Sequence, residues 1–331
     1  MKKTATKLIA VVIFLCLFCG NTKLSIAPGK AECVMELNSR RILYELNGDS
    51  RLPMASTTKI VTAITVLECV KNLQEEITIQ KQAEGIEGSS VYLKEGDKYT
   101  IEDLLYGLML RSGNDCAVSL ALHCSEDIAG FSLKMNEISQ KAGAVHSNFQ
   151  NPHGLPAREH YTTARDLTAI SCYAMQNPTF RKIVGTKYYQ PYQWHNKNKI
   201  LTRYEGAVGI KTGYTKEAGR CLVSAAERDG MMLVCALLNC PTTYERTMQL
   251  FDDAFSSYKM IKLLRPGEGF QVNEKMGYTK EEFSYPLMDG ESEALEYLVT
   301  PIKNDFKKEI LGVLEIRLAK RLLFSTNLYK L

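Results

Sequence analysis

The chain has 331 residues and a formal net charge of +4 at neutral pH, a length that allows one large domain together with a smaller one. Its apolar, charged and glycine fractions are those of an ordinary globular protein, which excludes disordered, collagen-like and coiled-coil classes. Residues 1–31 contain five lysines and no acid, so their removal changes the formal charge to +4 − 5 = −1. The basic excess therefore belongs to the N-terminal segment, and no nucleic-acid partner is expected.

The N-terminal segment has the layout of a secretory signal. Three lysines within the first seven residues precede an apolar run at residues 8–20, which is short beside the roughly 20 residues that span a membrane. We predict that residues 1–31 are a signal peptide, with Ala27 and Ala31 as alternative cleavage positions. The mature protein is then expected outside the cytoplasm, at the cell wall or the outer face of the membrane. A retained N-terminal anchor is the alternative.

Eight cysteines follow this segment. None of the eight forms a C-x-x-C pair or a Cys/His cluster with metal-ligand spacing, so no metal or other cofactor is expected. Most of them lie in apolar runs, as small buried thiols do. We predict mostly free, buried cysteines, although disulfides in an exported protein remain an alternative whose connectivity the sequence does not reveal.

The first hundred residues are predicted to combine short strands with one buried helix. Ile60, Ile64 and Leu67 recur at helical spacing, so a largely buried helix is expected to begin near Ser56. Residues with strand-like composition or alternation lie on both sides of it, at 32–37, 41–46, 77–79 and 90–93.

The middle third is predicted to be mostly helical. Thr100-x-x-Asp103 and Thr163-x-x-Asp166 resemble capping boxes, in which side chains bond the free N–H groups at a helix start. Apolar periodicity predicts helices at 101–111, 115–123, 131–142 and 164–175.

After this helical part the chain returns to β-structure. Strands are predicted at 206–213, 220–226 and 231–238, and a helix at 244–258. The element order predicts an α+β fold, an antiparallel sheet flanked by helices with an all-helical insertion. The stretch at 265–269 looks like a domain boundary, and strand-like runs at 314–318 and 323–328 follow it. We therefore predict a main domain at 32–262 and a small β-rich domain at 263–331.

Ser56 and Lys59 are three residues apart at the start of the first predicted helix, so their side chains share one face. A serine with a lysine one turn away is a nucleophile with its own base if burial lowers the lysine pKa. A helix-capping serine beside a solvated lysine is the alternative. Ser256 and Lys259 have the same spacing, so the pattern alone decides nothing.

Two further short motifs follow in the chain, Ser112-Gly113-Asn114 and Lys211-Thr212-Gly213. Ser56-x-x-Lys59 opens a buried helix, Ser112-Gly113-Asn114 lies between two helices, and Lys211-Thr212-Gly213 ends a strand. The three motifs are therefore able to surround one cleft. This trio is a known catalytic signature of penicillin-binding proteins and class A β-lactamases. Ser325-Thr326-Asn327 repeats the second pattern near the C-terminus without such a context.

With these motifs, the chain resembles the low-molecular-mass penicillin-binding proteins, the serine-type D-alanyl-D-alanine carboxypeptidases, over residues 32–262. Further blocks that carry the resemblance lie at 52–60, 108–115, 151–155 and 162–167. The middle motif is Ser-Gly-Asn, whereas β-lactamases usually have Ser-Asp-Asn. No Glu-x-x-x-Asn segment, which those lactamases use for deacylation, follows it. The resemblance thus implies a penicillin-binding-protein/β-lactamase-like fold on the carboxypeptidase side.

The resemblance also implies roles for the motif residues. Ser56 would attack the carbonyl between two terminal D-alanines and form an acyl-enzyme, with Lys59 as base and Ser112 as proton relay. Its substrate-binding residues would be Asn114, Lys211, Thr212, Gly213, Tyr214 and Arg246. Backbone N–H groups of Ser56 and Tyr214 would hold the oxyanion. Tyr214 stands where many relatives have histidine, which leaves rate and substrate preference open.

Peptidoglycan stem peptides and β-lactam antibiotics are the partners that the resemblance implies, and membrane association is possible. A β-lactamase or esterase of the same fold is one alternative function. A non-catalytic cell-wall scaffold is another. His153 is interpreted as a loop-structuring residue, because no acid or second histidine accompanies it.

Overall fold

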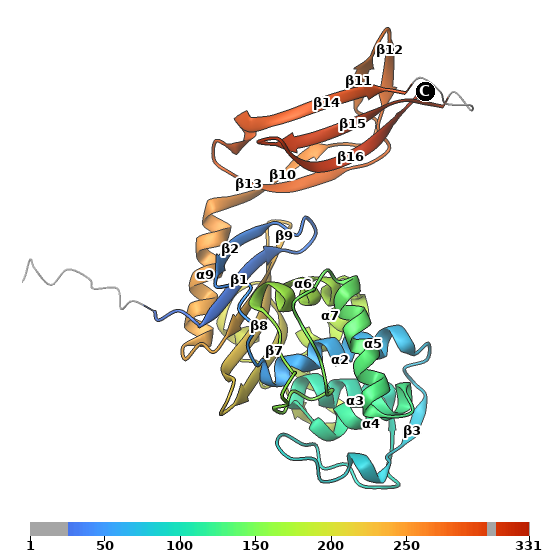
Figure 1. Cartoon of the computed structure of the whole chain (residues 1–331), viewed down its shortest axis with the longest axis vertical. Helices are drawn as coiled ribbons and strands as arrows, with labels where there is room; N and C mark the ends of the chain where they lie inside the picture. Colours follow the sequence, from blue (N-terminus) through green and yellow to red (C-terminus); the bar gives the residue numbers. More distant parts are fainter. Residues whose placement is uncertain (1–25, 303–308, 331) are drawn as a thin grey trace, which may run out of the picture.

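The computed structural model describes residues 26–302 and 309–330, which form two domains (Figure 1). The larger domain contains a sheet and a group of helices, and the helix α9 (Thr243–Ser257) leads into the smaller β domain. Strand β10 (Tyr258–Leu264) already pairs with β13 (Phe283–Met288) of the smaller domain, so the junction lies between Ser257 and Tyr258. It precedes the predicted boundary by five residues.

The predicted signal segment lies mostly outside the described residues. Its last residues are an exception: Lys30 donates its N–H to the carbonyl groups of Leu238 and Asn239, and strand β1 begins at Ala31. The sheet therefore begins within the segment predicted as 1–31.

The main sheet has five antiparallel strands in the order β2-β1-β9-β8-β7. Its strands are β1 (Ala31–Glu36), β2 (Ile42–Leu46), β7 (Ala207–Thr215), β8 (Gly219–Arg228) and β9 (Met231–Leu238). Every residue of β9 is buried, because helices cover both faces of the sheet centre. One sheet thus contains all the strands that were predicted at 32–37, 41–46, 206–213, 220–226 and 231–238.

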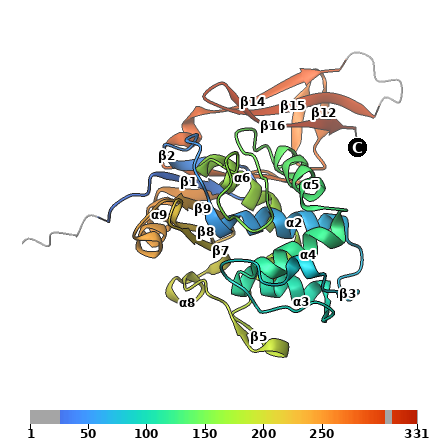
Figure 2. The same ribbon diagram turned by 60° about the horizontal axis from the view of Figure 1, so that its bottom comes forward.

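The helical part packs on one face of this sheet (Figure 2). It comprises α2 (Lys59–Cys69), α3 (Ile101–Tyr106), α4 (Asn114–Cys124), α5 (Ile128–Lys141), α6 (Ala164–Met175) and α7 (Pro178–Gly185). Thr100 and Asp103 form the predicted capping box, and Thr163 accepts the N–H of Asp166. A large apolar core joins this layer to the sheet. The other face is covered by α9.

Two local predictions differ from the structure. Residues 90–93 are not a strand, because the N–H groups of Val91 and Leu93 donate to the carboxylate of Asp115. The first predicted helix of the middle third keeps its length, but its last five residues form a π-helical turn, Gly107–Arg111. Helix α7 and a short hairpin, β5 (Tyr188–Tyr189) with β6 (Trp194–His195), were not predicted.

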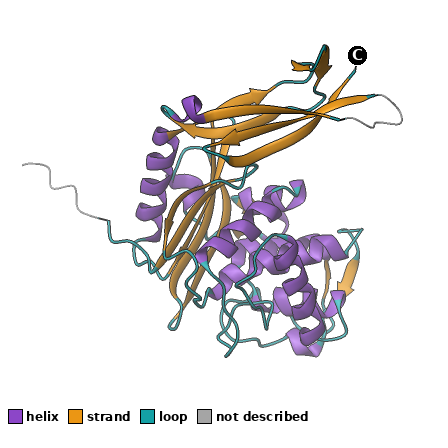
Figure 3. Ribbon diagram, turned by 45° about the horizontal axis from the view of Figure 1, so that its top comes forward, coloured by secondary structure: helices purple, strands orange, loops and turns teal. Residues whose placement is uncertain are grey.

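The small domain consists almost entirely of strands (Figure 3). Beside the β10–β13 pair, it has a five-stranded antiparallel sheet in the order β11-β12-β16-β15-β14. The strands of this sheet are β11 (Gly269–Val272), β12 (Lys275–Tyr278), β14 (Leu295–Pro301), β15 (Ile310–Leu318) and β16 (Arg321–Tyr329). Leu314, Ile316 and Leu328 are fully buried between the two sheets, so this domain has its own core.

Arg41 joins the two domains. Its guanidinium donates to both carboxylate oxygens of Glu291 and to the carbonyl oxygen of Pro286, and it lies over the rings of Tyr258 and Tyr285. Arg41 lies between β1 and β2, so these contacts bind the main sheet to strands β10 and β13 of the small domain and to Glu291 after them. None of the described helices has the length and apolar character that crossing a membrane requires.

Candidate active site

Ser56 lies in a 3-10 turn, Ala55–Thr58, that runs directly into α2. The N-cap residues of this turn and of α2 are Met54 and Thr58, so Ser56 is not at the capping position of either. Instead, Ser56 Oγ accepts a hydrogen bond from Lys59 Nζ at 3.0 Å. The capping interpretation is therefore wrong, and the serine and lysine form a bonded pair.

Lys59 is completely buried, with 0 % of its surface exposed. Besides Ser56, its Nζ donates to Asn114 Oδ1 at 2.6 Å and to the carbonyl oxygen of His153 at 2.6 Å. Among the described residues it forms no ion pair. Burial, together with the nearby positive charge of Lys211, holds the pKa of Lys59 well below its ordinary value. The lowered pKa favours loss of one proton from Lys59, and the neutral amine then keeps two N–H donors and has a lone pair that is able to accept a proton.

Ser112 follows the π-helical turn and is held in the left-handed region, with φ 67°. It separates that turn from α4, so the serine stands in a sharp corner between two helical segments rather than on a helix face. Only 5 % of Ser112 is exposed, and that surface lies in the same pocket as Ser56. The structure thus brings the first two predicted motifs together.

Asn114 begins α4 and orients Lys59. Its Nδ2 donates to the carbonyl oxygen of Glu87 at 2.5 Å, which directs Oδ1 toward Lys59 Nζ. The next residue, Asp115, accepts hydrogen bonds from Ser90 Oγ and from the N–H groups of Val91 and Leu93. These bonds hold the loop at 87–93 beside the site, which explains why it has no strand partner.

The third motif lies on β7, next to the Ser56 turn. Lys211 is 2 % exposed, and its Nζ donates to the carbonyl oxygen of Thr212 at 2.9 Å. Burial lowers the pKa of Lys211 to about 7, and Lys197 adds to this effect. A Cβ at Gly213 would lie 3.1 Å from the backbone nitrogen of Ser56, so glycine permits this close approach of strand and turn.

The loop at 151–155 lies on the remaining side of the Ser56 turn. Gly154 has φ 90°, and a Cβ there would lie 2.0 Å from the carbonyl oxygen of Ala55. Thr62 Oγ1 of α2 donates to the carbonyl oxygen of Pro152 at 2.6 Å. This anchoring places the His153 carbonyl against Lys59, so the loop-structuring interpretation of His153 agrees with its position.

A cavity of about 500 Å³ opens onto Ser56. Its lining comprises Ser56, Ser89, Ser112, Lys197, Thr212, Gly213, Tyr214, Arg220, Cys221, Thr243 and Tyr244. Two cationic side chains and no carboxylate appear in this lining of described residues. The cavity is therefore suited to an anionic ligand, and Tyr214 stands at its edge with 66 % of its surface exposed.

Arg246 does not reach this cavity, contrary to the prediction that it binds the substrate carboxylate. It lies on α9, and its Nε and Nη2 donate to the carboxylate of Glu32 at 3.0 and 2.7 Å. Nη2 also donates to Tyr44 OH, and Nη1 donates to Gln249. Glu32 is fully buried in β1, so its charge requires a partner. Arg246 is that partner, and its contacts therefore stabilise the fold.

Sequence reasoning did not identify several residues of the cavity. Lys197 and Ser89 come from loops, and Thr243 and Tyr244 come from the start of α9. Arg220 faces Tyr214 across the β7–β8 pair, a position that only the strand register reveals. No group of three or more His, Cys, Asp or Glu side chains suited to a metal occurs among residues 26–302 and 309–330.

Comparison with known proteins places these residues in a family. The family model described as D-alanyl-D-alanine carboxypeptidase matches residues 22–242. The chain belongs to this family. It is a serine-type D-alanyl-D-alanine carboxypeptidase with an α+β fold, as the motifs predict.

Relatives with known names support this assignment along most of the chain. D-alanyl-D-alanine carboxypeptidase DacF of Bacillus subtilis is 29 % identical over 298 residues, covering 85 % of this chain and 75 % of that protein. DacB2 of Mycobacterium tuberculosis is 32 % identical, covering 72 % and 86 % of the two chains. The crystal structure of penicillin binding protein 5 from Haemophilus influenzae aligns with a TM-score of 0.78 at 25 % identity, covering 94 % of this chain and 98 % of that one. The similarity to this solved structure thus includes the C-terminal β domain.

Proposed function

We propose that Ser56 is the nucleophile that removes the terminal D-alanine from peptidoglycan pentapeptides through an acyl-enzyme. The observation that carries this proposal is the contact between Ser56 Oγ and the fully buried Nζ of Lys59 at 3.0 Å. A neutral lysine at this distance takes the hydroxyl proton as the oxygen attacks the peptide carbonyl. The carbonyl carbon then bonds to Ser56, and the C–N bond to the last D-alanine breaks.

The leaving amine needs a proton, and Ser112 is placed to deliver it. Ser112 lines the same cavity as Ser56, at the corner between the π-helical turn and α4. Asn114 Oδ1 accepts a hydrogen bond from Lys59 Nζ, so the role of Asn114 in this proposal is mainly to position the base. The backbone N–H groups of Ser56 and Tyr214 stabilise the oxyanion, and water then releases the shortened peptide.

The substrate ends in a carboxylate, and Thr212 and the guanidinium of Arg220 line the cavity that would receive it. Lys211 does not line the cavity, but its buried side chain adds positive charge next to Thr212. Arg220 is solvent-exposed and forms no ion pair with any described residue. It lies opposite Tyr214, one residue pair beyond Gly213. We assign to Arg220 the carboxylate contact that the sequence resemblance had suggested for Arg246, because a bidentate guanidinium is well suited to a carboxylate.

A β-lactamase function is less well supported by the residues of the cavity. Rapid deacylation of a penicilloyl-enzyme needs a general base beside the ester, and no Asp or Glu belongs to the cavity lining among the described residues. We therefore expect β-lactams to remain covalently bound to Ser56. The bonded serine–lysine pair also argues against a purely structural wall protein, because a scaffold needs no buried lysine.

The test uses a fluorescent penicillin and a pentapeptide that ends in D-alanyl-D-alanine. The wild-type protein should become labelled and should release D-alanine, and Ser56→Ala should abolish both activities. Ser256→Ala is the matched control, because that serine has the same Ser-x-x-Lys spacing and should leave both unchanged. Labelling that persists in Ser56→Ala, or rapid turnover of the penicillin without release of D-alanine, would overturn the proposal.

We further propose that the protein acts outside the cytoplasm, as expected for an enzyme whose substrate is the cell wall. The support is the lysine-rich start followed by an apolar run at residues 8–20. Separation of cell fractions, together with N-terminal sequencing of the exported form, tests this. A protein found only in the cytoplasm with residues 1–31 still attached would contradict it.

A further inference from the structure

The turn that carries Ser56 has a strained backbone. Ala55, the residue before the serine, has φ 49°, in the left-handed region that residues with a side chain rarely adopt. Such a conformation persists only where surrounding contacts fix it. Thr57 Oγ1 donates to the carbonyl oxygen of Met54 at 2.6 Å, but this contact lies within the same short stretch of chain. The turn therefore depends on neighbouring segments for its conformation.

One such segment is the loop at 148–162, which is closed at its ends by backbone hydrogen bonds. Asn148 and Tyr161 exchange two of them, at 2.9 and 3.0 Å, and Leu52 and Thr162 exchange two more, at 2.8 and 3.0 Å. The middle of the loop is the stretch at 151–155 that lies against the Ser56 turn. The loop is thus fixed at both ends and in contact with the site at its centre.

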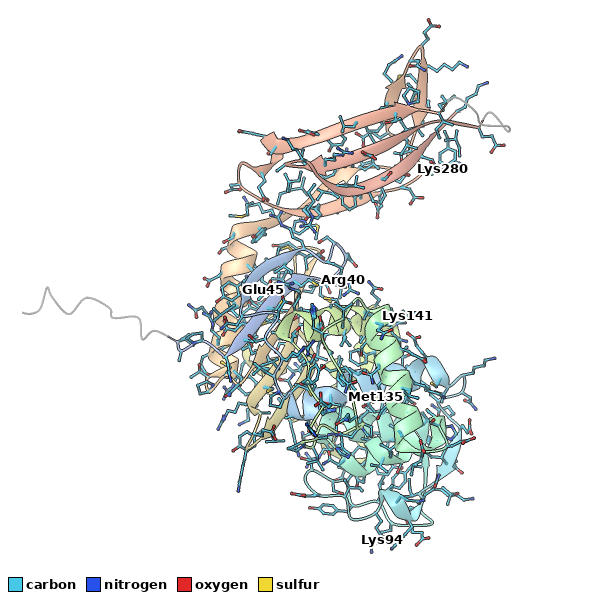
Figure 4. The ribbon with its side chains drawn as sticks, viewed as in Figure 1. Arg40, Glu45, Lys94, Met135, Lys141 and Lys280 are labelled. Atoms are coloured by element: carbon cyan, nitrogen blue, oxygen red, sulfur yellow. The ribbon has the colours of Figure 1, made fainter. Side chains whose placement is uncertain are left out.

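Helix α5 holds this loop from the side away from the site. Asn136 of α5 accepts the N–H of Phe149 on its Oδ1 at 2.8 Å and donates from Nδ2 to the carbonyl oxygen of Phe149 at 3.0 Å. The labelled side chain of Met135 shows the position of α5 in Figure 4. The ring of Phe149 in turn meets the ring of His160 edge-on, with the ring centres 5.8 Å apart. The orientation of His160 is therefore set by the loop and by α5 together.

His160 connects the loop to the Ser56 turn through its side chain. It is 5 % exposed, and its Nε2 lies 2.9 Å from Oγ1 of Thr58. Its Nδ1 accepts the N–H of Gln150 at 3.0 Å. Because a neutral imidazole has one donor and one acceptor, Nε2 carries the proton and donates it to Thr58. Burial lowers the pKa of His160 to about 4, which keeps the ring in this neutral form near neutral pH.

Thr58 passes this contact on to the catalytic pair. It lies between Ser56 and Lys59 in the chain, is fully buried, and is the N-cap residue of α2. Across the described residues, its bond to His160 is the one side-chain hydrogen bond that joins Ala55–Thr58 to a distant segment. The other contacts that enclose the turn are made by backbone atoms at the two glycines described above.

We propose that His160 is a positioning residue for the acylation of Ser56. Its hydrogen bond to Thr58 holds the strained turn in the conformation that presents Ser56 Oγ to Lys59 Nζ. This inference rests on the proposed function of Ser56. A misplacement of about 1 Å costs about 10²-fold in rate. Because the glycine contacts remain when the bond to Thr58 is lost, we expect a smaller effect, about tenfold.

The test measures saturation kinetics of acylation by a fluorescent penicillin, on the full chain. Thr58→Val removes the hydroxyl at similar side-chain volume, and His160→Phe removes both ring nitrogens. Each should lower the limiting rate constant about tenfold and leave the half-saturating penicillin concentration unchanged, because neither side chain lines the cavity. Thr58→Ser keeps the hydroxyl and should recover most of the rate. The combined variant should be no slower than the slower single one, since either change removes the same contact.

Thr168→Val is the matched control. Thr168 is equally buried, and its hydroxyl donates to the carbonyl oxygen of Ala164 within α6 at 2.7 Å. This change should lower the melting temperature and leave the rate constant of the folded protein as in the wild type. The control therefore separates lost stability from lost positioning.

Several outcomes would overturn the inference. Equal rate constants in the wild type and in Thr58→Val would do so and leave the proposed function intact. A fall in Thr168→Val as large as in Thr58→Val would assign the effect to stability alone. Effects that multiply in the combined variant would show that the two side chains act separately. A wild-type protein that is not labelled at Ser56 would overturn the proposed function and this inference with it. The comparison of Thr58→Val with Thr58→Ser decides the matter even where His160→Phe does not fold.

Discussion

The chain contains two Ser-x-x-Lys segments, and their contrast shows what makes one of them a site. Ser56 and Lys59 are hydrogen-bonded to each other, and the lysine has no exposed surface. Ser256 instead donates to the carbonyl oxygen of Asp253, and the side chain of Lys259 is 69 % exposed and pairs with Asp289. The spacing is identical, so burial and the packing of three chain segments around Lys59 create the difference.

The largest difference between the two segments is expected when each lysine is removed. Lys59→Ala should slow acylation of Ser56 by penicillin by about 10³-fold, since a positioned base contributes about 10²–10⁴-fold. Lys259→Ala should leave the rate unchanged, because that ammonium lies in solvent. Stopped-flow or gel-based labelling gives both rates. Equal rates for Lys59→Ala and the wild type would remove Lys59 from the mechanism.

A second contrast concerns two arginines, of which one is buried in an ion pair and the other is exposed. Arg246→Met leaves the carboxylate of Glu32 buried without its partner, so the free energy of unfolding should fall by about 3–5 kcal/mol. Urea denaturation measures this loss. The folded fraction should still react with penicillin at the wild-type rate, and Glu32→Gln added to Arg246→Met should recover part of the stability. A stable Arg246→Met protein that has lost acylation would instead place Arg246 in the active site.

Arg220→Met should have the opposite effect, with stability kept and substrate binding weakened. Loss of a charge-assisted contact to the terminal carboxylate corresponds to about 10–100-fold in KM. A peptide that ends in a carboxamide should show little change, because it lacks the charge that Arg220 recognises. Arg228→Met, at the far end of the same strand, is the matched control. An equal loss on both peptides would show that Arg220 acts on the fold and not on the carboxylate.

The two buried lysines of the site should produce opposite limbs of a pH profile. Lys59 acts as a neutral base, so acylation should rise with pH until its lowered pKa is passed. Lys211 assists the carboxylate as a cation, and its pKa is about 7, so kcat/KM should fall above that pH by up to about tenfold per unit. Lys211→Arg keeps its charge and should move the alkaline limb upward. An alkaline limb that stays in place in Lys211→Arg would assign it to another group.

Much of the fold was predictable from sequence because its signals are local. The capping pattern at Thr100 and Asp103, the apolar stripe of α2 and the three strands after residue 206 each depend on neighbours in the chain. The three motifs that meet at the candidate site were also predictable, since each motif carries its own residue types. Residues 90–93 were mistaken for a strand, because their N–H partner is the carboxylate of Asp115, more than 20 residues away.

The parts that sequence reasoning missed depend on contacts between distant segments. Arg246 and Glu32 are 214 positions apart, so nothing near Arg246 reveals that its charge is already paired. Arg220 joins the cavity only through the register of β7 and β8. Lys59 contacts His153 through the backbone carbonyl oxygen. Every residue type has this atom, so the sequence does not indicate the contact.

Gly154 and Gly213 have a consequence for every molecule that reacts with Ser56. A side chain at either position would overlap or crowd the backbone around Ala55 and Ser56, so the turn is enclosed by main chain on two sides. An acyl group on Ser56 therefore has only the open cavity to occupy, between Thr212, Tyr214 and Ser112. Water for hydrolysis would enter through that same opening, so we expect a bulky acyl group that fills the cavity to block its own release.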